Sequence, residues 1–450
     1  MKNVKLIIGI LVCSLWSCSN EEYNLPEDDS RLMKARESVL SNNSLDPSIV
    51  PNQIVIQYKQ EGLTYEQKLA IQSDLAARYY FSIEAIEKCS CDNDSIELWT
   101  INTSHTNFIG IENLVKNLTN TEEDEEDVEG DYQILFSVNS DEIPSDHISI
   151  LEEKVVANNN PDAVNIAILD TGVDYDYFPD PFLYNSSNTT YCTEELSGWD
   201  FVNNDYDARD DHGHGTMVTK IIVDALAPTN TPFHILPVKA FDQQGRGNYF
   251  NVTCGLQYIA KKKKRFLVNA SFGFYKIKNQ NILENIINGA SQDILLISSA
   301  GNMGIDTDQR GNQHFPSSYG AYNILTVGGY EGDFAAYPAY GDQYVSGFFI
   351  ATDSNRGGTS IDIAAPFEHE ILLDAGDYQI EITARGTSFS AAYATGRAAA
   401  RFYNNPLSPS LLKQNVLQTG FSSSSFNGLI NNNKILVKGF INTPMYRPLH

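Results

Sequence analysis

The chain has 450 residues, enough for two or three domains, and its 42% hydrophobic content with 30 Gly and 17 Pro is typical of globular proteins. Its formal net charge is −26, and most of the excess acidic residues lie before residue 160. Because nucleic-acid binding needs clustered Lys and Arg to contact phosphates, this balance excludes nucleic acid as the expected partner.

Residues 1–18 are predicted to be a lipoprotein signal peptide. Two lysines precede an apolar run, Leu6 to Leu15, that is too short to remain across a bilayer. The run ends in Leu15-Trp16-Ser17-Cys18, which resembles the box for lipid attachment at Cys18 in bacterial lipoproteins, although Trp16 is bulkier than usual. We therefore expect an exported, bacterial outer-membrane lipoprotein, held to the membrane by its N-terminal lipid and either displayed on the cell surface or released after processing. An ordinary cleaved signal is the alternative.

Polar residues 19–49 show no sustained period and are predicted to form a flexible tether. Outside the cytoplasm, later cysteines are expected to form disulfides, and the sequence leaves the pairing open among Cys89, Cys91, Cys192 and Cys254. A metal pair formed by Cys89 and Cys91 is the alternative.

Residues 50–140 are predicted to form a small α+β domain. Alternating and helical apolar patterns follow one another in the order βαββαβ, over residues 53–59, 65–79, 81–88, 95–101, 109–118 and 132–138. The acidic run Glu122 to Asp127 is predicted to be a solvated loop, with calcium capture as the alternative. Polar residues 141–162 are predicted to be a linker.

Between residues 163 and 445 the pattern changes to short apolar runs separated by helical stretches. The runs cover residues 164–169, 235–240, 266–270, 294–298 and 324–327. Continuous apolar runs suit strands that are buried on both faces, so we predict an α/β fold with a mainly parallel central sheet between helices. In such sheets the chemistry collects at the carboxyl ends of the strands.

Two candidate catalytic residues occupy such positions. Asp170 directly follows the run 164–169, where the strand would deliver a carboxylate at its end; alone it would be an ordinary turn aspartate. His214 stands between two glycines before the helical stretch 216–226, where small neighbours allow close approach to the ring. A purely structural role for His214, at the surface or in the core, is one alternative. A metal site formed with Asp210 and His212 is another.

Ser388 is the third candidate. It lies in Gly386-Thr387-Ser388, directly before a helical stretch over residues 389–403. Near a helix N-terminus, unpaired amides and the helix dipole favour negative charge developing beside the hydroxyl. By itself the tripeptide is often just a helix cap.

The order Asp170, His214, Ser388 along the chain is that of subtilisin-type triads. From about residue 164 to 440 the chain resembles the subtilisin family of serine proteases in several short segments: Ile168–Gly172, Gly198–Asn204, Gly213–Thr216, Val268–Gly273, Ser299–Asn302, Asp362–Pro366 and Gly386–Ser388. The resemblance implies a subtilisin-like three-layer fold and a serine endopeptidase that acts on proteins or peptides.

The resemblance also implies roles for particular residues. His214 would take the proton of Ser388 while Asp170 holds the imidazole, and an acyl-enzyme would form on Ser388. The side chain of Asn302 and the backbone N–H of Ser388 would bind the oxyanion. Substrate would pair as an extended strand with two edge segments, Ser271-Phe272-Gly273 and Gly245-Arg246-Gly247. It would also contact Ala300 and Gly301, the two residues before Asn302.

Family members carry inhibitory propeptides, and residues 50–140 match these in size and position. We expect this domain to act as an intramolecular inhibitor and the protease to cut its own linker between residues 140 and 161. The lipid would then stay on the propeptide and the protease would be released. No cofactor is expected for catalysis. Structural calcium is possible, but the sequence identifies no segment as its binding site.

Three positions depart from the family pattern. Met217-Val218-Thr219-Lys220 and Ala392 replace residues that are usual around the histidine and after the serine, and they are expected to affect packing rather than the reacting atoms. His314 occupies a position near the base of the primary specificity pocket. Together, His314 and Arg246 suggest that the pocket accepts acidic or polar side chains of the substrate. The alternative is that both residues are simply exposed to solvent. A catalytically silent, peptide-binding scaffold is the alternative function.

Overall fold

The computed structural model describes residues 46, 48–91, 94–119, 127–138, 160–178, 182–186, 192, 195–277, 280–332, 334–336, 344–374 and 379–438. The predicted signal peptide with Cys18, nearly all of the tether, the acidic run up to residue 126 and the linker up to residue 159 lie outside the described residues. Everything described from Ser48 onward belongs to one compact unit. Within the described part of the chain, no helix is long and apolar enough to cross a membrane.

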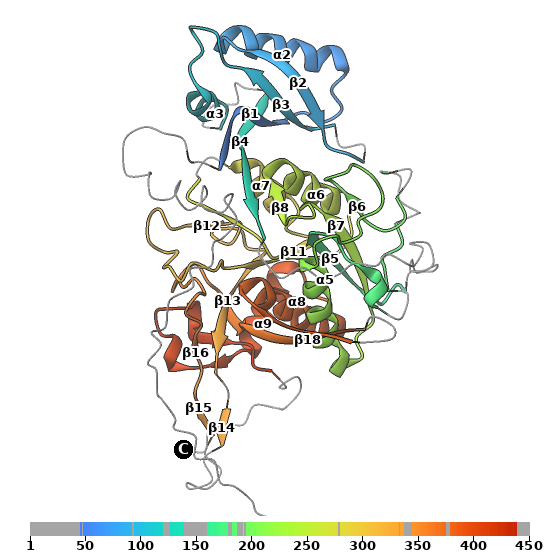
Figure 1. The fold of residues 1–450 in the computed structure, drawn as a ribbon, viewed down its shortest axis with the longest axis vertical. Coiled ribbons are helices and arrows are strands. Elements are labelled where there is room, and N and C mark those ends of the chain that lie inside the picture. Colours follow the sequence, from blue (N-terminus) through green and yellow to red (C-terminus); the bar gives the residue numbers. More distant parts are fainter. Residues whose placement is uncertain are drawn as a thin grey trace, which may run out of the picture. The chain divides into compact units, whose positions relative to one another are not determined.

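The first part of this unit has the predicted element order βαββαβ (Figure 1). Its elements are β1 (Ile49–Tyr58), α2 (Tyr65–Tyr79), β2 (Ser82–Lys88), β3 (Ile96–Asn102), α3 (Ile111–Thr119) and β4 (Val128–Ser137). The strands pair antiparallel in the order β2-β3-β1-β4. Strand β4 begins four residues before the predicted start at Tyr132, so it is longer than its apolar pattern indicated.

Local signals fix the helices of this part. Thr64 caps α2, because its side chain accepts a hydrogen bond from the Gln67 amide and the Gln67 side chain accepts one from the Thr64 amide. Tyr80 adopts a left-handed conformation, with φ of 58°, and ends the helix. In α3 the apolar residues recur at helical spacing and form one buried face: Ile111, Leu114, Val115 and Leu118.

The second part is built on a ten-stranded, mainly parallel sheet, as predicted. Its main path runs β20-β21-β17-β13-β11-β9-β5-β7-β6, and β16 pairs antiparallel with β13. The parallel strands are short and buried on both faces. The ten strands of the sheet are β5 (Val164–Asp170), β6 (Trp199–Asp200), β7 (Phe233–Lys239), β9 (Phe266–Ala270), β11 (Ile294–Ser299), β13 (Ile324–Glu331), β16 (Phe349–Ile350), β17 (Ile363–Pro366), β20 (Phe421–Ser422) and β21 (Lys434–Ile435).

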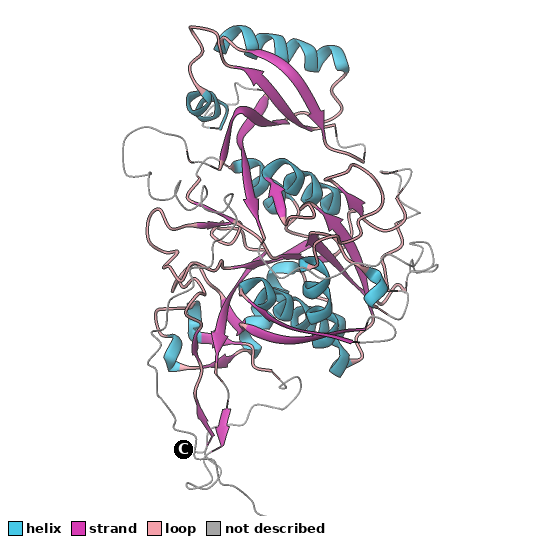
Figure 2. Cartoon of the chain, viewed as in Figure 1, coloured by secondary structure: helices cyan, strands magenta, loops and turns pink. Residues whose placement is uncertain are grey.

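Helices cover both faces of this sheet (Figure 2). Helices α6 (Tyr249–Lys261) and α7 (Asn281–Gly289) lie on one face, and α5 (His214–Leu226), α8 (Thr387–Asn404) and α9 (Pro409–Thr419) lie on the other (Figure 1). The fold is therefore the predicted three-layer α/β arrangement. The remaining elements are short: β8 (Arg246–Asn248), β10 (Phe274–Tyr275), β12 (His314–Phe315), β14 (Phe334–Ala336), β15 (Tyr344–Ser346), β18 (Glu368–Asp374), β19 (Gln379–Arg385), and the 3-10 turns Tyr175–Tyr177, Ala227–Thr229, Ser424–Phe426 and Asn431–Asn433.

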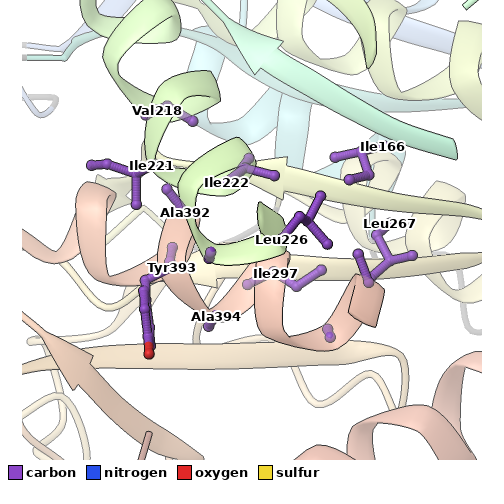
Figure 3. Packing of buried hydrophobic residues seen from close by; sticks show 14 of the residues in the cluster. Ile166, Val218, Ile221, Ile222, Leu226, Leu267, Ile297, Ala392, Tyr393 and Ala394 are labelled. Atoms are coloured by element: carbon purple, nitrogen blue, oxygen red, sulfur yellow. The ribbon is translucent and has the colours of Figure 1, made fainter. Parts of the chain in front are cut away.

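The main core lies where α5 and α8 pack on the sheet (Figure 3). Gly396 lets the two helices approach, because a Cβ there would lie 2.7 Å from the Cβ of Ala225. Met217 and Ala392, which depart from the family pattern, are both buried in this core. Burial of a methionine side chain contributes about 1.5–3 kcal/mol, so Met217 takes part in core packing, as expected.

Two disulfides link the first part to the second. Cys89, at the end of β2, bonds to Cys254 in α6, and Cys91 bonds to Cys192. The prediction that these four cysteines form disulfides is thus confirmed, and the metal-pair alternative for Cys89 and Cys91 is wrong.

Candidate active site

Asp170 ends strand β5 at the carboxyl edge of the sheet, and its side chain is completely buried. Its Oδ1 lies 2.7 Å from Nδ1 of His214 and accepts a hydrogen bond from the Thr171 amide at 2.8 Å. Because a carboxylate can only accept, Nδ1 of the imidazole is the protonated nitrogen. Nε2 of the ring is therefore left as the nitrogen that can take up a proton.

His214 is the first residue of α5, two residues before the predicted helix start. Gly213 precedes it with φ of 108°, a conformation that favours glycine. A Cβ on Gly215 would lie 2.1 Å from the carbonyl oxygen of Gly172, so only glycine lets this helix start against the turn that follows Asp170. The two glycines around the histidine thus bring the imidazole to the carboxylate.

Asp210 holds these two segments together, a role that the sequence did not reveal. Its buried carboxylate accepts hydrogen bonds from backbone amides and hydroxyls on both sides of the site: the amides of His212, Gly213 and Thr216, and the hydroxyls of Thr171 and Thr216. Both carboxylate oxygens are used by these donors. Within the described part of the chain, no group of three His, Cys, Asp or Glu side chains is arranged to hold a metal ion, so the metal alternative for Asp210, His212 and His214 has no support.

Ser388 lies in the first turn of α8, and the next residue brings this helix against the imidazole. The rings of Phe389 and His214 are 5.4 Å apart between centroids. The Ser388 hydroxyl donates to the backbone oxygen of Ser271 at 3.0 Å, and the Ser271 hydroxyl donates to the backbone oxygen of Ser388 at 2.8 Å. Among the described residues, Nε2 of His214 has no hydrogen-bond partner. The hydrogen bond from Ser388 to His214 is thus not made in this structure.

Asn302 follows strand β11, and its amide orientation is set by Thr387. Oδ1 of Asn302 accepts from the Thr387 amide at 2.9 Å and from the Thr387 hydroxyl at 2.8 Å. Because the backbone N–H of Thr387 needs an acceptor, the atom of the Asn302 carboxamide that faces it must be the oxygen and not the nitrogen. The Nδ2 group of Asn302 therefore remains available as a donor. It lies beside Gly386, because a Cβ added to Gly386 would be 3.3 Å from Nδ2. The Thr387 hydroxyl also accepts from the Gly301 amide at 3.0 Å.

A second residue that the sequence did not single out, Asn355, fixes the loop around Asn302. Its Oδ1 accepts from the amides of Met303 and Ile305, and its Nδ2 donates to the Ala300 carbonyl at 2.7 Å. Ala300 and Gly301 are buried, whereas Asn302 is exposed. Hydrogen bonds from Asn355 therefore hold the loop on both sides of Asn302, while Asn302 itself is exposed.

The segment Gly245-Arg246-Gly247 does not present a free edge, because strand β4 occupies it. Strand β8 pairs antiparallel with β4, with Arg246 opposite Ser137 and Gly247 opposite Phe136. The Val138 amide donates to the Gly245 oxygen at 2.8 Å. The edge predicted to bind substrate thus carries the end of the preceding domain, as Figure 1 shows for β4 and β8.

The second edge segment, Ser271-Phe272-Gly273, lies beside the same strand. The ring of Phe136 in β4 stacks on the ring of Phe272 with centroids 6.0 Å apart, and it also meets the rings of Phe241 and Phe274. The structure therefore brings both predicted edge segments to the end of β4.

His314 lies under this region and is completely buried. A Cβ on Gly273 would lie 2.2 Å from its ring, and one on Gly301 would lie 2.9 Å from it. Nδ1 lies 2.8 Å from the Ser317 hydroxyl, and burial lowers the pKa of His314 to about 3. The ring is therefore neutral at physiological pH, and the hypothesis that His314 and Arg246 favour acidic or polar substrate side chains stays a prediction. Arg246 is exposed, as its alternative interpretation held.

Comparison with known proteins identifies the family of the chain. The subtilase family matches residues 162–434. The thermophilic serine proteinase of Bacillus sp. (strain AK1) is 30% identical over 244 residues, covering 52% of this chain and 51% of that protein. Thermitase of Thermoactinomyces vulgaris is 25% identical over 214 residues, covering 43% of this chain and 72% of thermitase. The chain thus spans about half the length of the Bacillus relative.

Among solved structures, a cold adapted subtilisin-like serine proteinase aligns with 66% of this chain and 94% of that chain, at 22% identity and a TM-score of 0.45. The family match covers more than half of the 450 residues and includes Asp170, His214, Asn302 and Ser388. The chain belongs to the subtilase family, whose relatives named above are serine proteinases.

Proposed function

We propose that this chain is an exported serine endopeptidase that hydrolyses peptide bonds through Asp170, His214 and Ser388. The observation that carries the proposal is the buried contact of 2.7 Å between Asp170 and His214, beside the start of the helix that holds Ser388. A buried carboxylate fixes the imidazole and stabilises its protonated form during the reaction. The serine proteinases among the relatives support the same chemistry.

In the proposed reaction, an arriving substrate turns the Ser388 hydroxyl from the Ser271 carbonyl towards Nε2 of His214. Catalytic hydrogen bonds are often unformed without substrate, so the present partner of Ser388 is compatible with this step. His214 takes the serine proton as the oxygen attacks the peptide carbonyl, and then gives it to the leaving amine. Water, activated by the same imidazole, hydrolyses the acyl-enzyme. The reaction needs no cofactor, because this chain supplies the nucleophile, the base and the oxyanion donors.

The oxyanion would be bound by Nδ2 of Asn302 and the backbone N–H of Ser388. Support comes from the Thr387 hydrogen bonds, which leave only the donor end of the Asn302 carboxamide available. Donors that are oriented before the reaction cost no reorganisation when negative charge develops.

Residues 50–140 are proposed to be an inhibitory propeptide. Strand β4 lies along β8 in the position expected for an extended substrate, so the propeptide competes with substrate for this edge. The active enzyme would cut its own linker. A Ser388→Ala variant should therefore accumulate as one full-length species, and normal processing of this variant would assign the cut to another protease.

A direct test is covalent labelling with a fluorophosphonate, which reacts with activated serines. Wild-type protein that has been cut in the linker and reduced should be labelled on Ser388 and should hydrolyse casein, and Ser388→Ala treated in the same way should do neither. Ser390→Ala is the matched control, because this serine lies in the same helix and bonds to the Pro366 carbonyl, away from the imidazole. A wild-type protein that stays unlabelled and inactive after cutting and complete reduction, yet still binds peptides, would identify the chain as a silent scaffold.

A further inference from the structure

The linker is not the only covalent connection between the propeptide and the protease. Cys89 and Cys91 lie between β2 and β3 of the propeptide, whereas Cys254 lies in α6 and Cys192 lies shortly before β6 of the protease. The two disulfides span 165 and 101 residues of sequence, and both spans include the whole linker. Cutting the linker therefore cannot separate the two parts.

We propose that the propeptide remains a disulfide-bound subunit after the linker is cut, and that thiol–disulfide exchange is required to end its hold on the substrate edge. The inference rests on the proposed function for the identity of the inhibited site. It changes the sequence-based expectation, in which cutting alone released the protease.

Hydrogen bonds between the two parts also explain why a cut propeptide would stay in place. The carboxylate of Asp131 accepts from the amides of Asn281 and Ile282 at the start of α7. The side chain of Gln280 both donates to and accepts from the backbone of Tyr132. Beyond these residues, β4 continues into its pairing with β8.

The two disulfides make it hard for these hydrogen bonds to be lost for long. When two binding surfaces are joined by a short link, rebinding is intramolecular, with effective concentrations in the millimolar range. A strand that leaves the edge returns before a dilute substrate can replace it. With the disulfides intact, cutting the linker would therefore leave the substrate edge largely occupied.

The two disulfides differ in accessibility. Cys91 is partly exposed, although its partner Cys192 is buried. In the other pair both residues are buried, with 7% exposure for Cys89 and 1% for Cys254. Because exchange requires a thiolate to reach one sulfur, Cys91–Cys192 should be reduced first, and Cys89–Cys254 only after local opening.

A dithiol reductant supplies a balanced reaction. One of its thiolates attacks the sulfur of Cys91, which forms a mixed disulfide and releases Cys192 as a thiolate that takes up a proton. The second thiol of the reductant then displaces Cys91 and closes a cyclic disulfide. Each protein disulfide gains two electrons and two protons, so complete release consumes two dithiol molecules and yields four cysteine thiols.

The covalent part of the proposal can be tested without catalytic activity. A recognition sequence for an unrelated protease is inserted between residues 141 and 159 of the Ser388→Ala protein, and the purified protein is cut there. We expect one band on a denaturing gel without reductant and two bands after dithiothreitol. Two bands without reductant would overturn the proposal.

Paired substitutions show which disulfide is sufficient. Cys91→Ser with Cys192→Ser, and Cys89→Ser with Cys254→Ser, should each still run as one band, whereas the fourfold variant should separate without reductant. If a variant fails to fold, peptide mapping of the alkylated wild-type protein gives the same answer, because it must show the 89–254 and 91–192 linked peptides.

The regulatory part needs the active protein. Cut, oxidised wild-type enzyme is titrated with dithiothreitol while cleavage of a short peptide is measured, and we expect at least a tenfold rise only after the Cys89–Cys254 pair is reduced. Full activity of the cut, oxidised enzyme would overturn the proposed control by thiols. Failure of the proposed function has a different signature, because Ser388 would stay unlabelled by fluorophosphonate even after complete reduction.

Discussion

Thr387 connects two parts of the proposed oxyanion site through one hydroxyl group. The hydroxyl donates to Oδ1 of Asn302 and accepts from the Gly301 amide. We predict that Thr387→Val, which keeps the shape but removes the hydroxyl, lowers kcat by about 10- to 100-fold with little change in KM. Loss of an oxyanion donor itself costs about 10²–10³-fold, a range established on a subtilisin, and misorientation should cost less. Steady-state kinetics on a peptide substrate provide the measurement.

The effect should vanish when Asn302 is already absent. In an Asn302→Ala background, Thr387→Val should have little further effect on kcat, because the two residues act as one unit. Thr253→Val is a suitable control, since that hydroxyl is also buried and, among the residues that the structure describes, bonds only to the Tyr249 carbonyl within its own helix. Equal losses of kcat in both backgrounds would show that Thr387 acts independently of the asparagine.

His314 provides a prediction about acid stability. Burial lowers its pKa to about 3, below the ordinary value of 6.5, so the folded protein holds the neutral ring while the unfolded chain binds a proton. Its contribution to stability is therefore present above about pH 6.5 and is lost as the pH falls towards 3. Relative to His314→Gln, wild type should lose roughly 2 kcal/mol of unfolding free energy between pH 7 and pH 5. Urea unfolding of both proteins in a Ser388→Ala background measures this difference.

A gap between wild type and His314→Gln that stays constant over this pH range would mean that the ring takes up a proton as readily in the folded protein as in the unfolded chain.

Among the elements, strand β4 and helix α7 meet at a buried carboxyl group. Burial raises the pKa of Asp131 to about 7, although hydrogen bonds from Tyr249 and from the start of α7 act in the opposite direction. A carboxyl group whose folded pKa exceeds its ordinary value of 3.8 contributes stability that is present below about pH 4 and is lost as the pH rises through 7. The contact between propeptide and protease should therefore weaken as the pH rises from about 4 to about 7.

Asp131→Asn mimics the protonated group and removes the titration. The difference in unfolding free energy between wild type and this variant should fall by roughly 2.5 kcal/mol from pH 5 to pH 8, again in a Ser388→Ala background. Hydrogen exchange at the amides of Asn281 and Ile282 localises the change to the start of α7. A pH-independent difference would show that the amide hydrogen bonds keep the carboxylate charged throughout.

Secondary-structure elements could be predicted because their patterns are local. The runs at 65–79 and 266–270 were predicted with the bounds that the structure has, and Asp170 was expected at the end of its strand. The start of β4 was missed because Glu129, Gly130 and Asp131 interrupt the apolar pattern, although Asp131 is buried against α7. Tertiary contacts can bury polar residues that a local pattern assigns to a loop.

The supporting residues of the site could not be predicted for the same reason. Asp210, Thr387 and Asn355 act through hydrogen bonds to segments far away in the sequence, and each resembles an ordinary loop or cap residue when read alone. Disulfide pairing likewise depends on which loops the fold brings together.

For the whole molecule, the proposed lipid and the two disulfides together would determine where the protease goes after the proposed processing. If Cys18 is lipidated, the anchor is on the propeptide side of the cut linker, and the protease remains attached to it through Cys192 and Cys254. We predict that both fragments partition into the detergent phase after cutting, and that dithiothreitol transfers only the protease to the aqueous phase. Immunoblots of the two phases, with mass spectrometry of the N-terminal peptide for the lipid, provide the measurement.

Cys18→Ser separates anchoring from cross-linking. Without the lipid, both fragments should be aqueous whether or not dithiothreitol is present, yet they should still run as one band on a gel without reductant. A protease that reaches the aqueous phase before reduction while the propeptide stays in detergent would contradict the cross-link.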